Sequence, residues 1–266
     1  MPSIIKKAEF VPFIVFLFML SLIAGCKNAK KSPPPAQDIA ANTEELGKKV
    51  KEIIQYSLEF ALGNEGAIDS IHQYVLVNDS LVQQVYVKRQ FAPMWSDKQQ
   101  WKPLGDSLLN FIAQAKLYGL FPEDYHFGAL DTIQRQFIND SLSRSAKRDA
   151  VLWANADVLL TDAFMHIVKD IKLGRLPADS VTLRADSILT DEFYINRLAL
   201  VEKHNSLSLV FHALEPGHKG YEDLKQAIPA FLANADYREF TIVPSPKSNQ
   251  VEFKRLLQKR LFEAGF

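Results

Sequence analysis

The stretch Trp153–Pro177, WANADVLLTDAFMHIVKDIKLGRLP, decides the fold of this chain. Apolar residues recur three or four positions apart along it, which predicts one long helix with a wide apolar face. The residues of this face are Leu152, Ala156, Leu160, Ala163, Phe164, Ile167, Val168 and Ile171. Gly174 stands where a C-terminal cap is expected, and Pro177 follows it. Such a helix needs partners on several sides, so we expect it at the centre of a helical domain.

The same helix carries ionisable side chains at Asp162, His166 and Asp170, which are four residues apart and therefore share one face. They could bind a metal or act as an acid/base pair. A site of that kind needs ligands from elsewhere, and no second cluster is evident in the sequence. The simpler interpretation is the polar face of an amphipathic helix, and we prefer it.

Shorter helices are predicted on both sides of this stretch. Capping residues and apolar spacing place helix starts near Thr43, Asp79, Lys102, Pro122, Gly128 and Val251. Three short helices follow the central one, with breaks at Asn205 and Pro216. The one strand-like run is Phe240–Val243 (FTIV), and it is short. We therefore expect a mainly α protein, a multi-helix domain with at most a short strand near 240–243.

Composition and charge exclude several classes of protein. The 266 residues are 47% hydrophobic and 23% charged, as in ordinary globular proteins. Basic and acidic residues number 31 each, so the net charge gives no reason to expect a nucleic-acid partner. The glycine-rich signatures of nucleotide sites and the G-x-S-x-G of serine hydrolases do not occur. One cysteine supports neither an internal disulfide nor a zinc cluster, and we expect no metal and no cofactor.

The N-terminus predicts export and lipid attachment. Lys6 and Lys7 precede an apolar run that ends in Leu22-Ile23-Ala24-Gly25-Cys26, which resembles a bacterial lipobox. We expect 1–26 to be a lipoprotein signal peptide and Cys26 to be the lipidated residue. The alternative is a plain signal peptide or short membrane anchor with an incidental cysteine. Residues 27–41, KNAKKSPPPAQDIAA, are basic and proline-rich, as expected of a flexible tether.

Two further groups of residues could carry chemistry. Glu123 and Asp124 stand close to His126, but acidic residues at a helix start are explained by the helix dipole. Trp95 and Trp101 could form an aromatic platform for a sugar. Aromatic residues around a proline-containing turn are more often a corner of the core, and we favour that interpretation.

Four stretches in the same order resemble one known family, the large bacterial L,D-transpeptidases with an N-terminal helical scaffold domain. The first contains Tyr86, Arg89, Phe91, Pro93 and Trp95. The second contains Ala115, Gly119, Leu120, Pro122, Glu123, Asp124, Tyr125 and His126. The third contains Asp157, Leu160, Thr161, Asp162, Ala163 and Phe164, and continues to Gly174, Arg175 and Pro177. The fourth contains Leu214, Pro216, Gly220, Tyr221 and Leu224.

The resemblance implies a scaffold rather than an active site. The scaffold residues it implies are Tyr86, Arg89, Pro93, Trp95, Asp124, Tyr125, Asp157, Thr161, Asp162, Gly174, Arg175, Pro216 and Tyr221. The family's catalytic domain carries a histidine and an S-x-G-C-x-R-type cysteine motif, whose thiolate attacks a tetrapeptide stem. Cys26 lies in the lipobox and cannot replace that cysteine. No catalytic residue is therefore assigned to this chain.

The resemblance also implies a division into domains and a location. We expect the scaffold domain over 42–236, and over 237–266 a linker with the first helix of an incomplete peptidoglycan-binding-like domain. The expected protein is a lipid-anchored scaffold in the bacterial cell envelope, facing the periplasm. Its expected partners are the membrane and either peptidoglycan or a cell-wall enzyme. The alternatives are a peptidoglycan hydrolase that uses the acidic and histidine residues above, and a purely structural envelope protein.

Overall fold

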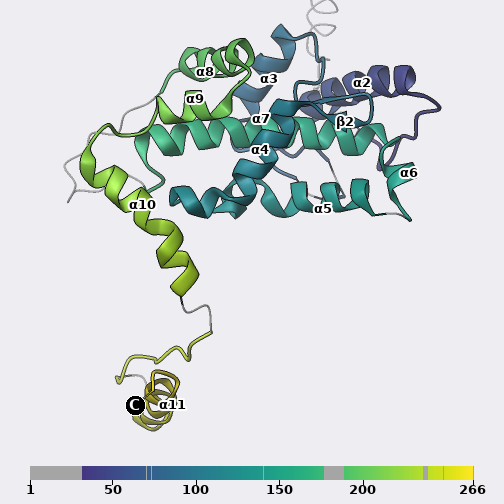
Figure 1. Cartoon of the computed structure of the whole chain (residues 1–266). Helices are drawn as coiled ribbons and strands as arrows, with labels where there is room; N and C mark the ends of the chain where they lie inside the picture. The colour runs from purple at the N-terminus through teal and green to yellow at the C-terminus, as the bar shows by residue number, and fades with distance from the viewer. Residues whose placement is uncertain are drawn as a thin grey trace, which may run out of the picture. The chain divides into compact units, whose positions relative to one another are not determined.

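The computed structural model describes residues 32–69, 71–72, 74–139, 141–176, 189–235, 239–247 and 249–265. These residues form a mainly helical protein with one two-stranded sheet, which confirms the predicted fold class (Figure 1). Cys26 and Pro177 lie outside the described residues. The signal peptide and the lipidation site therefore stay predictions.

The predicted central helix is α7, Ala150–Leu173. Asp149 caps its start by accepting a hydrogen bond from the Val151 amide, and Gly174 ends it at a φ of 86°, where a side chain would be strained. By length and apolar composition α7 could cross a membrane, but 89% of its most apolar window is buried inside the protein. It is therefore the core helix.

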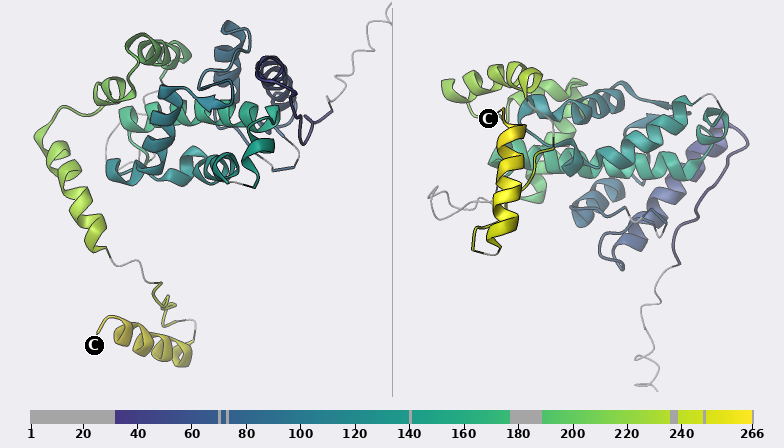
Figure 2. Two further views of the ribbon diagram at one scale, coloured as in Figure 1. Left: turned by 45° about the vertical axis from the view of Figure 1, so that its right-hand side comes forward. Right: turned by 90° about the horizontal axis from the view of Figure 1, so that it is seen from below.

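Helices from both halves of the chain surround α7 (Figures 1 and 2). Those in contact with it are α2 (Thr43–Ala61), α3 (Asp79–Lys88), α4 (Pro103–Ala113), η2 (Pro122–Tyr125), α5 (Phe127–Ile138) and α8 (Asp191–His204). Three short elements complete this region: η1 (Ala115–Tyr118), α6 (Ser143–Ala146) and α9 (Leu207–His212). The buried side chains form one continuous core around the apolar face of α7.

The strands are not where the sequence placed them. A two-stranded antiparallel hairpin joins β1 (Ser96–Asp97) to β2 (Gln100–Trp101). It turns through two residues with positive φ, and strands of two residues are too short to give an alternating pattern. The predicted run Phe240–Val243 forms no strand, because the amide of Thr241 donates to Glu263 of a helix instead of joining a ladder.

The end of the expected tether is attached to the helical body. The Ala40 amide donates to the Arg148 carbonyl at 2.8 Å, and the Ala150 amide donates to the Asp38 carbonyl at 2.9 Å. The side chain of Asp38 also lies 2.6 Å from the Lys49 ammonium of α2. Residues 38–40, which we expected in a flexible tether, are therefore part of the folded structure, because their backbone groups complete the start of α7.

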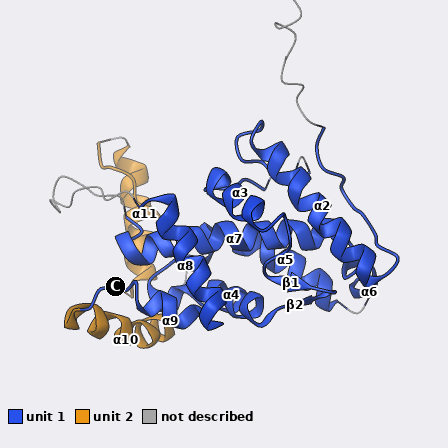
Figure 3. Ribbon diagram, turned by 90° about the horizontal axis from the view of Figure 1, so that it is seen from above, with its two compact units in different colours: residues 1–217 blue, residues 218–266 orange. Residues whose placement is uncertain are grey.

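The chain divides into two compact units, residues 1–217 and residues 218–266 (Figure 3). The second unit contains α10 (Lys219–Asn234) and α11 (Gln250–Glu263), and neither helix has a buried residue. Within this unit the Arg260 guanidinium lies 4.0 Å from the centre of the Phe240 ring. The expected domain boundary near 236 stays a prediction.

Candidate functional site

The polar residues of α7 form three junctions with segments that precede it in the chain. The first is centred on Asp157, whose side chain is completely buried. Its carboxylate accepts hydrogen bonds from the amides of Met94, Trp95 and Ser96 at 2.6 to 3.1 Å. The Ser96 hydroxyl and the Tyr86 hydroxyl also donate to it, at 3.0 and 2.7 Å. One carboxylate thus fixes α3 and the start of the β1–β2 hairpin to the central helix.

Thr161, one turn further along α7, completes this first junction. Its hydroxyl accepts from the Trp95 indole at 2.9 Å and lies 2.9 Å from the Tyr86 hydroxyl. Burial raises the pKa of Asp157, although the surrounding donors oppose this effect. Burial likewise raises the pKa of Tyr86, so its hydroxyl keeps its proton and stays a donor.

The second junction is centred on Asp162, which is also completely buried. Its carboxylate accepts from the amides of Val77 and Asn78 at 3.0 and 2.8 Å, and from the Asn78 side chain at 3.0 Å. His126 places its Nε2 atom 2.6 Å from the same carboxylate. Burial alone would raise the pKa of Asp162, but His126 and the two amides outweigh burial and the pKa is lowered. Asp162 therefore attaches the loop before α3 and the start of α5 to α7.

The third junction joins η2 to the C-terminal part of α7. The buried Tyr125 hydroxyl donates to the Asp170 carboxylate at 2.8 Å, and burial raises the pKa of that tyrosine. His166 lies 3.1 Å from the Asp124 carbonyl oxygen and 3.5 Å from Asp170. The Asp124 side chain pairs with Arg175, just beyond the end of α7.

The other predicted scaffold residues do not bond to the three carboxylates of these junctions. Arg89 pairs with Glu202 of α8 at 2.6 Å. The Pro93 carbonyl accepts from the Lys102 ammonium at 2.9 Å, beside the first junction. Pro216 lies in the turn after α9, and Tyr221 is in the second unit.

The structure places Asp162 in the second junction and both His166 and Asp170 in the third, although all three share a face of α7. Asp162 is bonded to two amides and His126, whereas Asp170 is bonded to Tyr125. Glu123 is exposed on η2. Among the described residues no three His, Cys, Asp or Glu side chains are grouped so that they could hold a metal ion. These side chains join α7 to the elements packed against it.

The tryptophans belong to the core corner that we favoured. Trp95 is completely buried, and Trp101 packs against Phe137 and Trp153 at ring-centre distances of 6.0 and 5.0 Å. Sequence reasoning missed several partners of the junctions, namely Val77, Asn78, Met94 and Ser96. No local pattern shows that the amide of each bonds to a carboxylate more than 60 residues away.

A family model described as a Scaffold domain matches residues 80–228, which is more than half of the chain. The chain belongs to the Scaffold domain family. No curated protein and no solved structure gave a match. The matched part of the Scaffold domain contains the three junction carboxylates, Asp157, Asp162 and Asp170, together with Tyr86, Tyr125 and His126.

Proposed function

We propose that this chain is a cell-envelope lipoprotein that serves as the scaffold portion of an L,D-transpeptidase-like protein. In this role it positions peptidoglycan or a cell-wall enzyme and does not itself form cross-links. The proposal rests on the contacts that the motif residues make with one another in the structure. Tyr86, Trp95, Asp157 and Thr161 come from two of the stretches that resemble that family, and they bond to one another in the buried first junction.

The absence of a second cysteine supports the non-catalytic part of the proposal. Acyl transfer in the family requires a thiolate nucleophile, and Cys26 is the single cysteine in these 266 residues. A lipidated Cys26 has no free thiol. We therefore expect these residues on their own to catalyse no cross-linking.

The alternative of a hydrolase is less well supported by the position of two of its candidate residues. An acid/base pair needs two carboxyl groups that can reach a substrate. Asp162 is completely buried and Asp124 is paired with Arg175. No described feature favours this second function.

The enzymatic part of the proposal is tested with purified protein and tetrapeptide muropeptides. We expect no cross-linked product, and any such product would contradict a non-catalytic scaffold. A parallel assay measures co-sedimentation with isolated cell-wall sacculi and capture of cell-wall enzymes from envelope extract. Failure of both binding assays would favour a purely structural envelope protein.

The lipid anchor has its own test. The chain is expressed in a bacterial host, and the mass of its N-terminal peptide is measured. We expect a lipid-modified Cys26 as the first residue, and an unprocessed precursor for Cys26→Ser. A mature chain that begins elsewhere, or that carries no lipid, would contradict the anchor.

A further inference from the structure

Four aliphatic side chains are exposed at the C-terminal end of α2. They are called the apolar platform here, and their exposed fractions are 55% for Leu62, 58% for Ile71, 49% for Val75 and 60% for Val77. Single exposed aliphatic residues are common on protein surfaces. These four instead lie within residues 62–77, where the loop after α2 folds back on itself through the Ala67–Val75 bridge.

Backbone contacts within the loop that carries the apolar platform hold this loop closed. The Ala67–Val75 bridge and the bond from the Leu76 amide to the Gly66 carbonyl at 2.9 Å close it. Leu76 is buried, whereas Val75 and Val77 on either side of it are exposed. The buried Asp162 then accepts from the Val77 amide at 3.0 Å. The backbone around Val75 and Val77 is therefore held in place by these bonds while the two side chains stay exposed.

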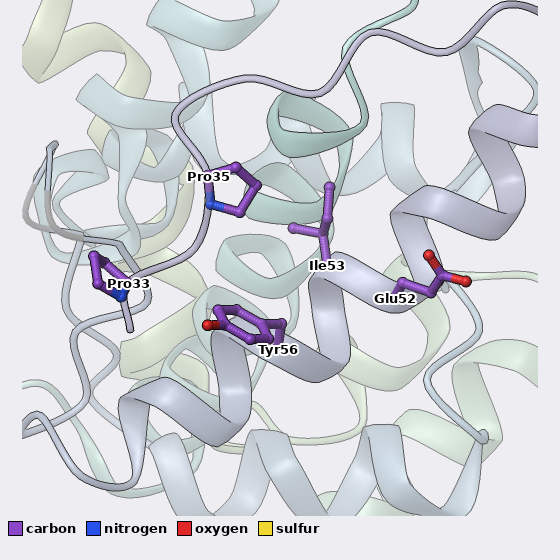
Figure 4. A pocket seen from close by; sticks show the side chains of 5 residues that line it. All are labelled: Pro33, Pro35, Glu52, Ile53 and Tyr56. Atoms are coloured by element: carbon purple, nitrogen blue, oxygen red, sulfur yellow. The ribbon is translucent and has the colours of Figure 1, made fainter. Parts of the chain in front are cut away.

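The first described residues of the N-terminal segment lie against the same helix, α2. Pro33 and Pro35 line a shallow groove of about 340 Å³ with Glu52, Ile53 and Tyr56 of α2 (Figure 4). Leu62 follows Tyr56 by six residues, so the two lie about 9 Å apart along the helix axis. The described chain thus begins beside the half of α2 that leads to the apolar platform.

Chain length limits how far the platform can be from the membrane. Cys26 precedes Pro33 by seven residues, which span at most about 25 Å when fully extended. Pro33 itself is packed near Tyr56. A lipid on Cys26 therefore keeps Pro33 within about 25 Å of the bilayer surface, and the apolar platform begins about 9 Å beyond Tyr56 along the axis of α2.

We propose that the apolar platform docks on the lipid bilayer that holds the anchor. This inference rests on the proposed lipidation of Cys26. Aliphatic side chains that enter the headgroup region bind more firmly when basic residues nearby attract anionic lipids. The sequence supplies Lys27, Lys30 and Lys31 between the anchor and the folded body. Docking would hold the scaffold in one orientation on the membrane.

The test measures contact between the platform and lipid acyl chains. Cys26 is the only cysteine, so the chain from Cys26 onward is coupled through its thiol to maleimide lipid in phosphatidylethanolamine vesicles with a minority of phosphatidylglycerol. This chain contains every described core residue. Coupling imposes the anchor, so the result does not depend on whether cells lipidate Cys26. An Ile71→Trp variant reports contact, since lipids brominated near the headgroup quench tryptophan emission.

We expect brominated lipid to quench the emission of Ile71→Trp more than that of the unsubstituted chain. The matched control is Ile138→Trp, at the end of α5 that leads into α6, because Ile138 is 66% exposed in the same unit. It should show no added quenching. In Ile71→Trp, the further changes Val75→Ser and Val77→Ser should abolish the added quenching while circular dichroism stays unchanged.

Three outcomes would overturn the proposal. The first is equal emission of Ile71→Trp in brominated and ordinary vesicles. The second is stronger quenching of Ile138→Trp, which would mean that another face meets the membrane. The third is a dimer in solution that dissociates on Ile71→Ser, because a second copy of the chain would then cover the platform. An anchor that fails to form in cells would contradict the proposed function alone.

Discussion

At the scale of single residues, Asp157 is the carboxylate of α7 that accepts the most hydrogen bonds. It accepts three backbone amides and two hydroxyl groups in a completely buried position. Asp157→Ala removes the acceptor of the three amides and the Ser96 hydroxyl, whereas the Tyr86 hydroxyl still lies 2.9 Å from Thr161. Donors left unsatisfied in a buried site destabilise the folded protein. We expect the free energy of unfolding to fall by about 3–5 kcal/mol, as measured by urea denaturation.

Asp97→Ala is the matched control for this change, because Asp97 is exposed in the same hairpin. Its effect should lie within about 0.5 kcal/mol of zero. If the two alanine variants unfold at the same urea concentration, Asp157 does not hold the first junction together.

Asp162 and Asp157 should respond to pH in opposite directions. The pKa of Asp162 is lowered in the folded protein, so its stabilisation is present above the unfolded-state pKa of about 4 and is lost as the pH falls below it. The pKa of Asp157 is raised, so its contribution to stability declines as the pH rises through the folded-state value. Urea unfolding of Asp162→Asn and Asp157→Asn between acidic and neutral pH measures both trends.

For Asp162→Asn, the loss of stability relative to the unsubstituted protein should shrink as the pH is lowered. For Asp157→Asn, it should shrink as the pH is raised. Parallel pH profiles for the two variants would contradict the environments described for these carboxylates.

At the scale of elements, α4 packs so closely against the start of the hairpin that only glycine fits at position 105. A Cβ atom added to Gly105 would lie 2.3 Å from the Trp95 carbonyl oxygen. Gly105→Ala should therefore push α4 away from the hairpin and lower the free energy of unfolding by about 1–3 kcal/mol. Gly128→Ala is the control, since a Cβ there has no neighbour within 4 Å. It should raise stability by about 0.4–1 kcal/mol. Thermal unfolding of the two variants separates the predictions, and equal shifts would contradict them.

Helices and strands could be predicted where apolar spacing and capping residues define them locally. The periodic apolar face and Gly174 gave α7 both its extent and its end. The helix predicted to start near Lys102 is α4, which ends at Ala113 and is followed by a 3-10 turn. Apolar spacing is similar in the two helix types, so the sequence pattern did not reveal the change. The sequence did not predict the β1–β2 hairpin, because a strand of two residues is too short to show an alternation of apolar and polar side chains.

Sequence patterns did not predict which residues hydrogen-bond to the junction carboxylates. Spacing showed that Asp162 and His166 share a helix face, but Asp162 bonds to amides 84 and 85 residues earlier in the chain. Those contacts depend on where the loop before α3 arrives in three dimensions. The resemblance to a scaffold identified Tyr86, Trp95, Asp157 and Thr161 as a related set, and the structure shows that they are in contact.

At the scale of the whole molecule, the core lies entirely in the first unit. Every buried apolar residue among those described falls between Ala40 and Leu214. Removing residues 239–266 should therefore leave the unfolding temperature of the remaining chain unchanged. Removing residues 32–41 should lower it, because Ala40 is buried and its amide bonds to Arg148. Differential scanning calorimetry compares the two deletions, and a large loss from the C-terminal deletion would contradict this division of stability.

The three carboxylates of α7 have a further consequence if the chain is exported. An exported chain passes through the translocon unfolded, and an apolar segment of this length can leave it sideways into the lipid as a stop-transfer helix. An aspartate near the middle of such a segment opposes this by about 2.5–3.5 kcal/mol. Asp157 and Asp162 both occupy central positions in α7. The residues that fasten the finished domain would thus also let its most apolar helix cross the membrane instead of stopping within it.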